Sequence, residues 1–217
     1  MTGYDYIREP SAIYAESFAL CRAATDLSRF PVDMYALVLR LVHSVGRPAV
    51  ADNLVWDDAV VTAASTALKS GKPVLCDVRM VADGVIRSRL PLGSDVLCTL
   101  GFGSTAGIAS RLGTTRSAAA VELWKPWLDG AVVAIGNAPT ALFHLLERLD
   151  EGWPKPAAIL GFPVGFVGAA ESKAALVEAA AADRLNIPYI TLQGRDGGSA
   201  LAAAAVNALA GTGSEAA

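Results

Sequence analysis

Three short apolar segments, each followed by a glycine-containing turn and a helix-forming segment, occupy residues 131–210. Strands that alternate with helices in this way form right-handed βαβ units and a parallel sheet. We therefore predict an α/β fold with three layers, in which a mostly parallel sheet is flanked by helices within a single domain. The predicted strands are 131–135, 157–160 and 188–192, and the predicted helices are 139–149, 171–183 and 199–210.

The N-terminal part of the chain is less regular but predicts elements of the same kinds. Residue 33 is an Asp that suits a helix N-cap, and Gly46 is placed to end that helix. We assign residues 1–210 to the domain and 211–217 to a flexible tail. Further helices are predicted at 10–24, 57–70 and 114–128, further strands at 73–78 and 95–100, a turn at 83–84 and a mobile loop at 101–107.

Composition excludes several classes of function. The formal charge is −3 with no run of like charges, which argues against nucleic-acid binding. Three widely spaced cysteines give neither a disulfide framework nor a zinc site, and favour a reducing cytoplasm. We expect no signal peptide, no membrane helix and no metal ion. Hydrophobic residues make up 53% of the chain, so we expect a homo-oligomer.

His43 is one of two histidines and lies within the predicted helix 33–45. At about 100° per residue it points away from the apolar stripe of that helix, on a mixed face with Leu39 and Arg40. It is therefore a surface histidine, a ligand-facing one, or one with a metal-binding or structural role. It is also the side chain whose ordinary pKa best suits proton transfer near neutrality. The second histidine, His144, lies among leucines and is predicted to pack in the core.

Several polar side chains have both a structural and a functional interpretation. The hydroxyl of Ser17 either bonds back to the carbonyl of Ile13, as is common in helices, or contacts a ligand. Arg87 belongs to a basic group that is either solvated or binds carboxylates. Arg116 opposes the helix dipole at a helix start, which an anion there would explain.

The three C-terminal strands all lead into glycine-containing turns at 136–140, 161–168 and 194–199. In an open parallel sheet, ligands bind beyond the carboxyl ends of the strands. Glycine permits close backbone approach, and the following helix offers free N–H groups to anions. Together the turns predict a broad, donor-rich rim for a large anionic ligand. The chain contains neither a G-x-G-x-x-G nor a G-x-x-x-x-G-K-[ST] pattern.

The sequence as a whole resembles the precorrin-8X methylmutase family of cobalamin biosynthesis. The resemblance is collinear over almost the entire chain. Its more specific motifs are Asp26-L-S-R-F, Arg40-L-V-H, Leu75-C-D, Arg87-S-R-L-P, Thr115-R-S-A-A-A, Gly136-N-A-P-T-A-L-F, Lys155-P-A-A-I-L-G-F-P-V-G-F-V-G-A-A-E-S-K and Gly194-R-D-G-G-S-A. Thr114 and Ile86 depart from the pattern, where Asn and Thr would be expected.

The resemblance implies a cytoplasmic isomerase that moves a methyl group between adjacent ring carbons of the tetrapyrrole precorrin-8X, giving hydrogenobyrinate without a cofactor. It implies a homodimer with the active site near the subunit interface. His43 matches the family histidine that protonates a ring nitrogen. Ser17 and Arg40 match family positions that contact the substrate. Arg87, Arg116, Ser117 and Asn137 fall within family motifs and are predicted to bind the substrate as well.

Three alternatives remain. The first is a cobalt-precorrin-8 methylmutase of the anaerobic pathway. The second is a non-catalytic corrinoid-binding protein, and the third is a nucleotide-binding α/β enzyme.

Overall fold

The sheet at the centre of the molecule has six strands in the order β1-β6-β5-β4-β2-β3. The computed structural model describes residues 4–211. Neighbouring strands are parallel except for the edge strand β1, which is antiparallel to β6. The strands are β1 (Leu54–Trp56), β2 (Val74–Cys76), β3 (Val96–Leu97), β4 (Val132–Ile135), β5 (Ala158–Gly161) and β6 (Tyr189–Leu192).

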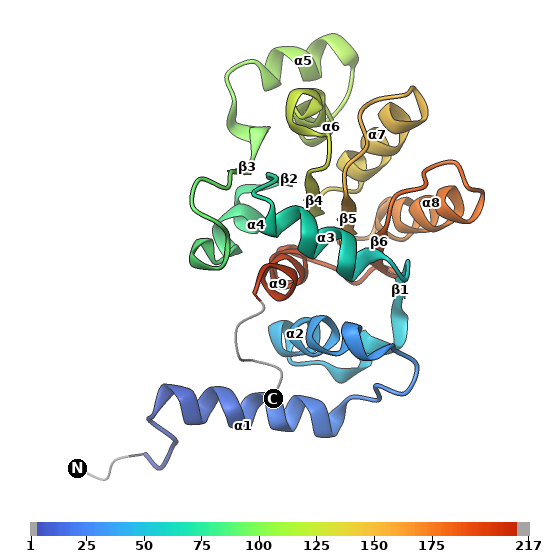
Figure 1. Ribbon diagram of the computed structural model, residues 1–217. Helices are drawn as coiled ribbons and strands as arrows, with labels where there is room; N and C mark the ends of the chain where they lie inside the picture. The colour runs from blue at the N-terminus through green and yellow to red at the C-terminus, as the bar shows by residue number, and fades with distance from the viewer. Residues whose placement is uncertain (1–3, 212–217) are drawn as a thin grey trace.

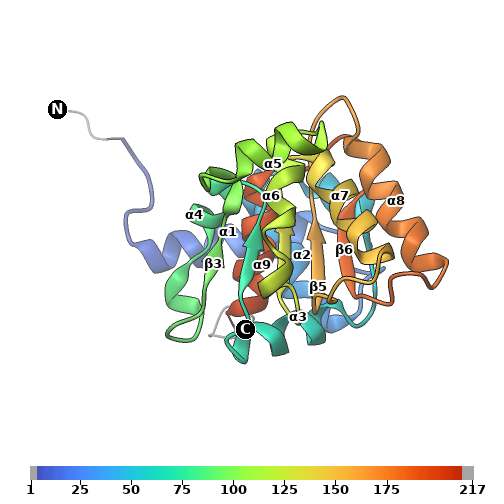
Figure 2. The same cartoon turned by 90° about the horizontal axis from the view of Figure 1, so that it is seen from above.

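Helices cover both faces of the sheet, which makes the three layers visible in Figures 1 and 2. One apolar core packs the helices α2, α3, α4 and α9 against one face, and a second core packs α6, α7 and α8 against the other. Helix α1 lies outside the first layer, against α2 (Figure 1). The helices are α1 (Pro10–Ala24), α2 (Tyr35–Val45), α3 (Val60–Lys69), α4 (Arg79–Gly84), α5 (Thr105–Leu112), α6 (Arg116–Glu122), α7 (Pro139–Asp150), α8 (Ala169–Ala181) and α9 (Ser199–Ala210).

The predicted α/β fold is confirmed, and so are the three C-terminal strand–helix units to within two residues at most boundaries. Buried strands such as β4, whose four residues are all buried, need a continuous apolar sequence, and this signal is easy to detect. The alanine-rich sequence of α9 has a packing reason. A Cβ on Gly84 would lie 2.7 Å from the Cβ of Ala203, so small residues allow α4 and α9 to approach closely.

Other local predictions are wrong. The turn expected at 83–84 is the end of α4, and most of the expected mobile loop at 101–107 folds into a short 3-10 turn and the start of α5. The helix expected at 114–128 ends at Glu122 and is followed by the 3-10 turn η5 (Lys125–Trp127). Strand β1 was not predicted, because three residues carry too little periodicity.

Among residues 4–211, no helix is long and apolar enough to cross a membrane. The predicted tail, apart from Gly211, lies outside the described residues.

Candidate active site

Helix α2 presents His43 at the edge of the molecule rather than in its core. Leu37, Val38, Leu41 and Val42 are buried on the opposite side, as the apolar stripe predicts. Gly46 ends the helix in the left-handed conformation with φ of 65°, which confirms the predicted stop. Asp33, however, is not the N-cap, because a 3-10 turn over Val32–Met34 precedes the helix. Leu39 is buried, so the polar face around His43 is narrower than predicted.

Helix α1 completes the surroundings of His43. The Ser17 hydroxyl oxygen lies 3.0 Å from Nδ1 of His43, so Ser17 does not need the structural interpretation in which it bonds back within its own helix. The Phe18 ring stacks on the imidazole, with 4.8 Å between the centroids and 20° between the planes. Among residues 4–211, Nε2 of His43 has no hydrogen-bond partner. The imidazole is thus fixed at one nitrogen and on one face, and its other nitrogen is available.

Arg40 lies one turn before His43 and joins the same cluster. Its guanidinium donates a hydrogen bond to the Tyr14 hydroxyl at 2.5 Å and lies 5.0 Å from the centroid of the Phe18 ring. Cation–π contacts of this kind hold a guanidinium in one orientation. The structure therefore brings together Ser17, Arg40 and His43, three of the predicted site residues, across the α1–α2 contact.

The first of the three glycine-containing turns is not the open donor site that the sequence predicts. The fully buried carboxylate of Asp77, at the end of β2, accepts hydrogen bonds from the peptide N–H groups of Gly136, Asn137 and Ala138 at 2.8–2.9 Å. Burial raises the pKa of the Asp77 carboxyl, and these three hydrogen bonds oppose that rise. The Asp77 side chain thus occupies the position expected for a ligand's anion, and the exposed side chain of Asn137 remains as the donor.

Three of the other predicted residues lie near the starts of α6 and α7. Thr115 caps α6 by accepting from the N–H of Ala118, and its hydroxyl lies 2.8 Å from that of Thr140 in the first turn of α7. This contact brings Arg116 and Ser117 to the same end of the sheet as Asn137. These helices cover the opposite face of the sheet from α2 (Figure 1). The six binding candidates therefore do not form one cluster with His43 within a single chain.

Arg87 lies apart from both groups, in the 3-10 turn η3 (Arg87–Arg89) before β3. The Arg116 guanidinium donates to the carbonyl of Leu100 at 3.2 Å. This contact gives Arg116 a structural partner besides the anion that the sequence predicts.

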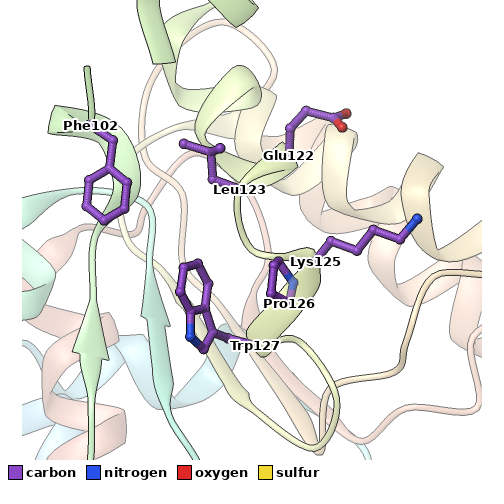
Figure 3. Close-up of a pocket in the computed structure, with 6 residues that line it drawn as sticks. All are labelled: Phe102, Glu122, Leu123, Lys125, Pro126 and Trp127. Atoms are coloured by element: carbon purple, nitrogen blue, oxygen red, sulfur yellow. The ribbon is translucent and has the colours of Figure 1, made fainter. Parts of the chain in front are cut away.

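A hollow of about 430 Å³ is present on the α6 side of the sheet but contains none of the predicted residues. Phe102, Leu123, Pro126 and Trp127 make it largely apolar (Figure 3). His43 belongs to the helix layer on the other face, so this hollow is not the candidate site. Within residues 4–211, no three His, Cys, Asp or Glu side chains group closely enough to hold a metal ion.

Comparison with known proteins identifies the family. A family model described as precorrin-8X methylmutase matches residues 12–212. This chain belongs to the precorrin-8X methylmutase family. A precorrin-8X methylmutase of Pseudomonas aeruginosa is 55% identical over 95% of this chain and 97% of its own length. A cobalt-precorrin-8 methylmutase of Priestia megaterium is 34% identical over 93% of this chain and 87% of its own length.

The fold of the family is also the fold of this chain. The crystal structure of precorrin-8X methylmutase from Thermus thermophilus superposes with a TM-score of 0.82 at 36% identity. The superposition covers 92% of this chain and 94% of that one. The single-domain α/β architecture is therefore common to this methylmutase family member and its solved relative.

Sequence reasoning missed three residues that contact the predicted site residues: Tyr14, Phe18 and Asp77. Tyr14 and Phe18 share a helix with Ser17 at spacings of three and one, and only the packing of α1 on α2 brings them to His43. Asp77 had a signal, since a carboxylate directly after a buried strand must find donors. His144 is buried as predicted, and its Nε2 lies 2.5 Å from the Glu122 carboxylate, a partner that the sequence did not indicate.

Proposed function

We propose that this protein is an isomerase that converts precorrin-8X to hydrogenobyrinate by an intramolecular methyl shift, with His43 as the acid. The observation that carries the proposal is the Ser17–His43 contact of 3.0 Å, which holds Nδ1 and leaves Nε2 available among residues 4–211. The reaction is inferred from the family to which the chain belongs. Nε2 of His43, which has no hydrogen-bond partner among residues 4–211, supplies the proton.

The Ser17 hydroxyl fits the two states that an acid passes through. In the imidazolium both nitrogens carry protons, and Nδ1–H donates to Ser17 while Nε2–H faces the substrate. After Nε2 gives its proton to a ring nitrogen, the same hydrogen bond holds the neutral tautomer with hydrogen on Nδ1. Protonation of a ring nitrogen withdraws electrons from the conjugated system of the macrocycle and so eases the methyl shift. General acid assistance of this type contributes about 10²–10⁴-fold.

Arginines hold the carboxylates at the edge of the macrocycle in this proposal. Arg40 is the nearest to His43 along α2, and its hydrogen bond to Tyr14 and its cation–π contact with Phe18 fix its direction. Bidentate arginine–carboxylate pairs determine orientation as well as affinity. Arg87, Arg116, Ser117 and Asn137 are assigned further contacts with the substrate.

We propose that the active protein is a homodimer whose interface includes α1 and completes the pocket at His43. Helix α1 has fifteen residues and none of them is buried. Ile13 is 46% exposed and Leu20 is 60% exposed. A partner subunit seated on this face would cover these side chains and close the open side of the His43 imidazole. The same contact would bring a second rim of glycine-containing turns to the site.

We propose the metal-free substrate rather than its cobalt form. The support is the identity of 55% to a precorrin-8X methylmutase against 34% to a cobalt-precorrin-8 methylmutase. A cytoplasmic location is proposed on the three cysteines, which all remain free thiols.

The test is incubation of the purified protein with precorrin-8X, followed by visible spectroscopy and mass spectrometry. Conversion to hydrogenobyrinate changes the spectrum and leaves the mass unchanged, because the reaction is an isomerisation. A parallel incubation with cobalt-precorrin-8 decides between the two substrates. Binding without a spectral change would instead support a corrinoid-binding protein.

A further inference from the structure

Lys173 is a buried cation with no role in the reaction described above. It lies on α8 and is 1% exposed, beside a hollow of about 340 Å³ between α8 and the end of β6. Its ammonium donates a hydrogen bond to the backbone carbonyl oxygen of Asp196, its one hydrogen-bond partner among residues 4–211. Burying a charge is costly, and an apolar side chain of similar length would pack at lower cost. The position of this ammonium therefore needs an explanation beyond packing.

The turn that receives the Lys173 hydrogen bond is joined to the turn before α8. The N–H of Gly198 donates to the carbonyl of Phe162 at 2.8 Å, and the N–H of Gly165 donates to that of Arg195 at 3.3 Å. A Cβ on Gly197 would lie 2.4 Å from the carbonyl oxygen of Pro163. The two glycine-containing turns thus pack backbone against backbone as one unit.

The side chain of Asp196 connects this unit to the helix that carries His43. Its carboxylate lies 3.3 Å from the Arg47 guanidinium. Arg47 directly follows Gly46 at the end of α2, one helical turn after His43. The two side chains are 55% and 59% exposed, so their ion pair adds little to stability. The ion pair joins the residue that follows α2 to the turn between β6 and α9.

We infer that Lys173 is a positioning residue for the methyl shift: it fixes the turn at 194–198 so that Asp196 holds Arg47, and with it the His43 end of α2, against the rim. The inference rests on the proposed methylmutase activity. Lys173 acts from beneath the rim and does not contact the reacting atoms. An acid displaced by about 1 Å can lose about 10²-fold in rate, so modest loosening of this link is measurable.

The first experiment compares Lys173→Met and Lys173→Gln with the wild-type protein by hydrogen exchange, without substrate. Methionine keeps the length and removes the donor, whereas glutamine retains an N–H donor. The Met variant is expected to speed exchange at the N–H groups of Gly165 and Gly198, and the Gln variant to do so less. If the Met variant fails to fold, the Gln variant carries both this measurement and the kinetic one. Unchanged exchange at both N–H groups would overturn the inference.

The second experiment measures kcat and KM for Lys173→Met, Asp196→Ala and the double variant on precorrin-8X. Each single variant is expected to lower kcat about 10-fold or more with a smaller change in KM. The double variant should lose no more than the stronger single one, because both act through one link. A Lys173→Met protein that is folded with kcat within twofold of wild type would overturn the inference, and so would losses that multiply. Inactivity of the wild-type protein would instead count against the proposed function, while the exchange experiment would still decide whether Lys173 holds the rim.

Discussion

His43 combines three restraints that a surface histidine would not need. Ser17 engages Nδ1 at 3.0 Å, Phe18 stacks on one face of the ring, and α2 holds the backbone up to the glycine stop at Gly46. Each restraint removes a freedom that a flexible side chain would otherwise lose on binding substrate. At the scale of single residues, these restraints support the proposal that His43 is a preorganised proton donor.

Replacement of Ser17 by Ala should lower kcat about 10- to 100-fold. This range corresponds to losing one hydrogen bond to a charged group, about 1.5–3 kcal/mol. Ser17→Thr retains the hydroxyl and is the matched control, expected to keep most of the activity. Steady-state kinetics on precorrin-8X measure both. Equal rates for the Ala and wild-type proteins would remove Ser17 from the proton transfer.

The sequence alone was enough to place His43 away from the apolar stripe, because that depends only on helical periodicity. It was not enough to give His43 its partners. Ser17 and Phe18 reach the imidazole through the crossing of α1 over α2, and a crossing has no local sequence signal. The same limit applies to Asp77, whose three donors are about sixty residues further along the chain.

At the scale of elements, the rim is a packed assembly of turns rather than a row of independent anion sites. Asp77 occupies the donors of the first turn, and the other two turns pair through their backbones. The glycine-containing turns that follow three consecutive strands predicted the location of this rim. It did not predict the use of the donors, since a buried carboxylate and a bound ligand present the same oxygen atoms to the backbone.

Gly197→Ala should destabilise the protein by about 2 kcal/mol or more. The added methyl group would lie 2.4 Å from the carbonyl oxygen of Pro163 and 2.5 Å from that of Phe162, and both are backbone atoms. Gly107→Ala in α5 is the matched control, because a Cβ there has no atom within 4 Å. Alanine within a helix is expected to add about 0.5–1 kcal/mol. Urea unfolding measures both changes, and equal stability of the two variants would contradict the packing of the rim.

The buried ammonium of α8 predicts a pH dependence of stability. Burial lowers the pKa of Lys173 from 10.5 to about 8, against the raising effect of Asp196. Between these values the unfolded chain binds a proton that the folded protein does not, so the unfolding free energy rises with pH. The unfolding free energy of the wild-type protein relative to Lys173→Met should therefore increase from about pH 8 to about pH 10.5. A difference that stays constant over this range would show that Lys173 keeps its ordinary pKa, and a difference that falls would show that folding raises its pKa.

At the scale of the whole molecule, two observations support the proposed homodimer. They are the exposure of α1 and the separation of the predicted binding residues. His43, Ser17 and Arg40 lie on the α1–α2 side, whereas Arg116, Ser117 and Asn137 lie where α6 and α7 begin (Figure 1). In the homodimer that we propose, a second subunit seated on α1 would reconcile the two groups by adding its own rim. The family resemblance predicted a dimer, while the layer architecture alone would fit a monomer equally well.

If α1 forms the interface of the proposed homodimer, Leu20→Glu should convert the protein to a monomer and reduce activity, because it places a charge on the exposed α1 face. Leu112→Glu is the matched control. Leu112 is a similarly exposed leucine, at 45%, on α5. The Leu112→Glu variant should have the same molar mass in solution and the same reaction rate as the wild-type protein. Light scattering coupled to size exclusion gives the mass of each protein. A wild-type protein that is monomeric and active would refute the shared-pocket proposal.

Single-turnover kinetics of His43→Ala on precorrin-8X, followed by the visible spectrum, test the central claim most directly. We predict a rate lower by about 10²–10⁴-fold. The unfolding free energy should stay close to that of wild type, because the imidazole lies off the apolar stripe of α2. A His43→Ala protein that converts precorrin-8X at the wild-type rate would show that the proton comes from elsewhere.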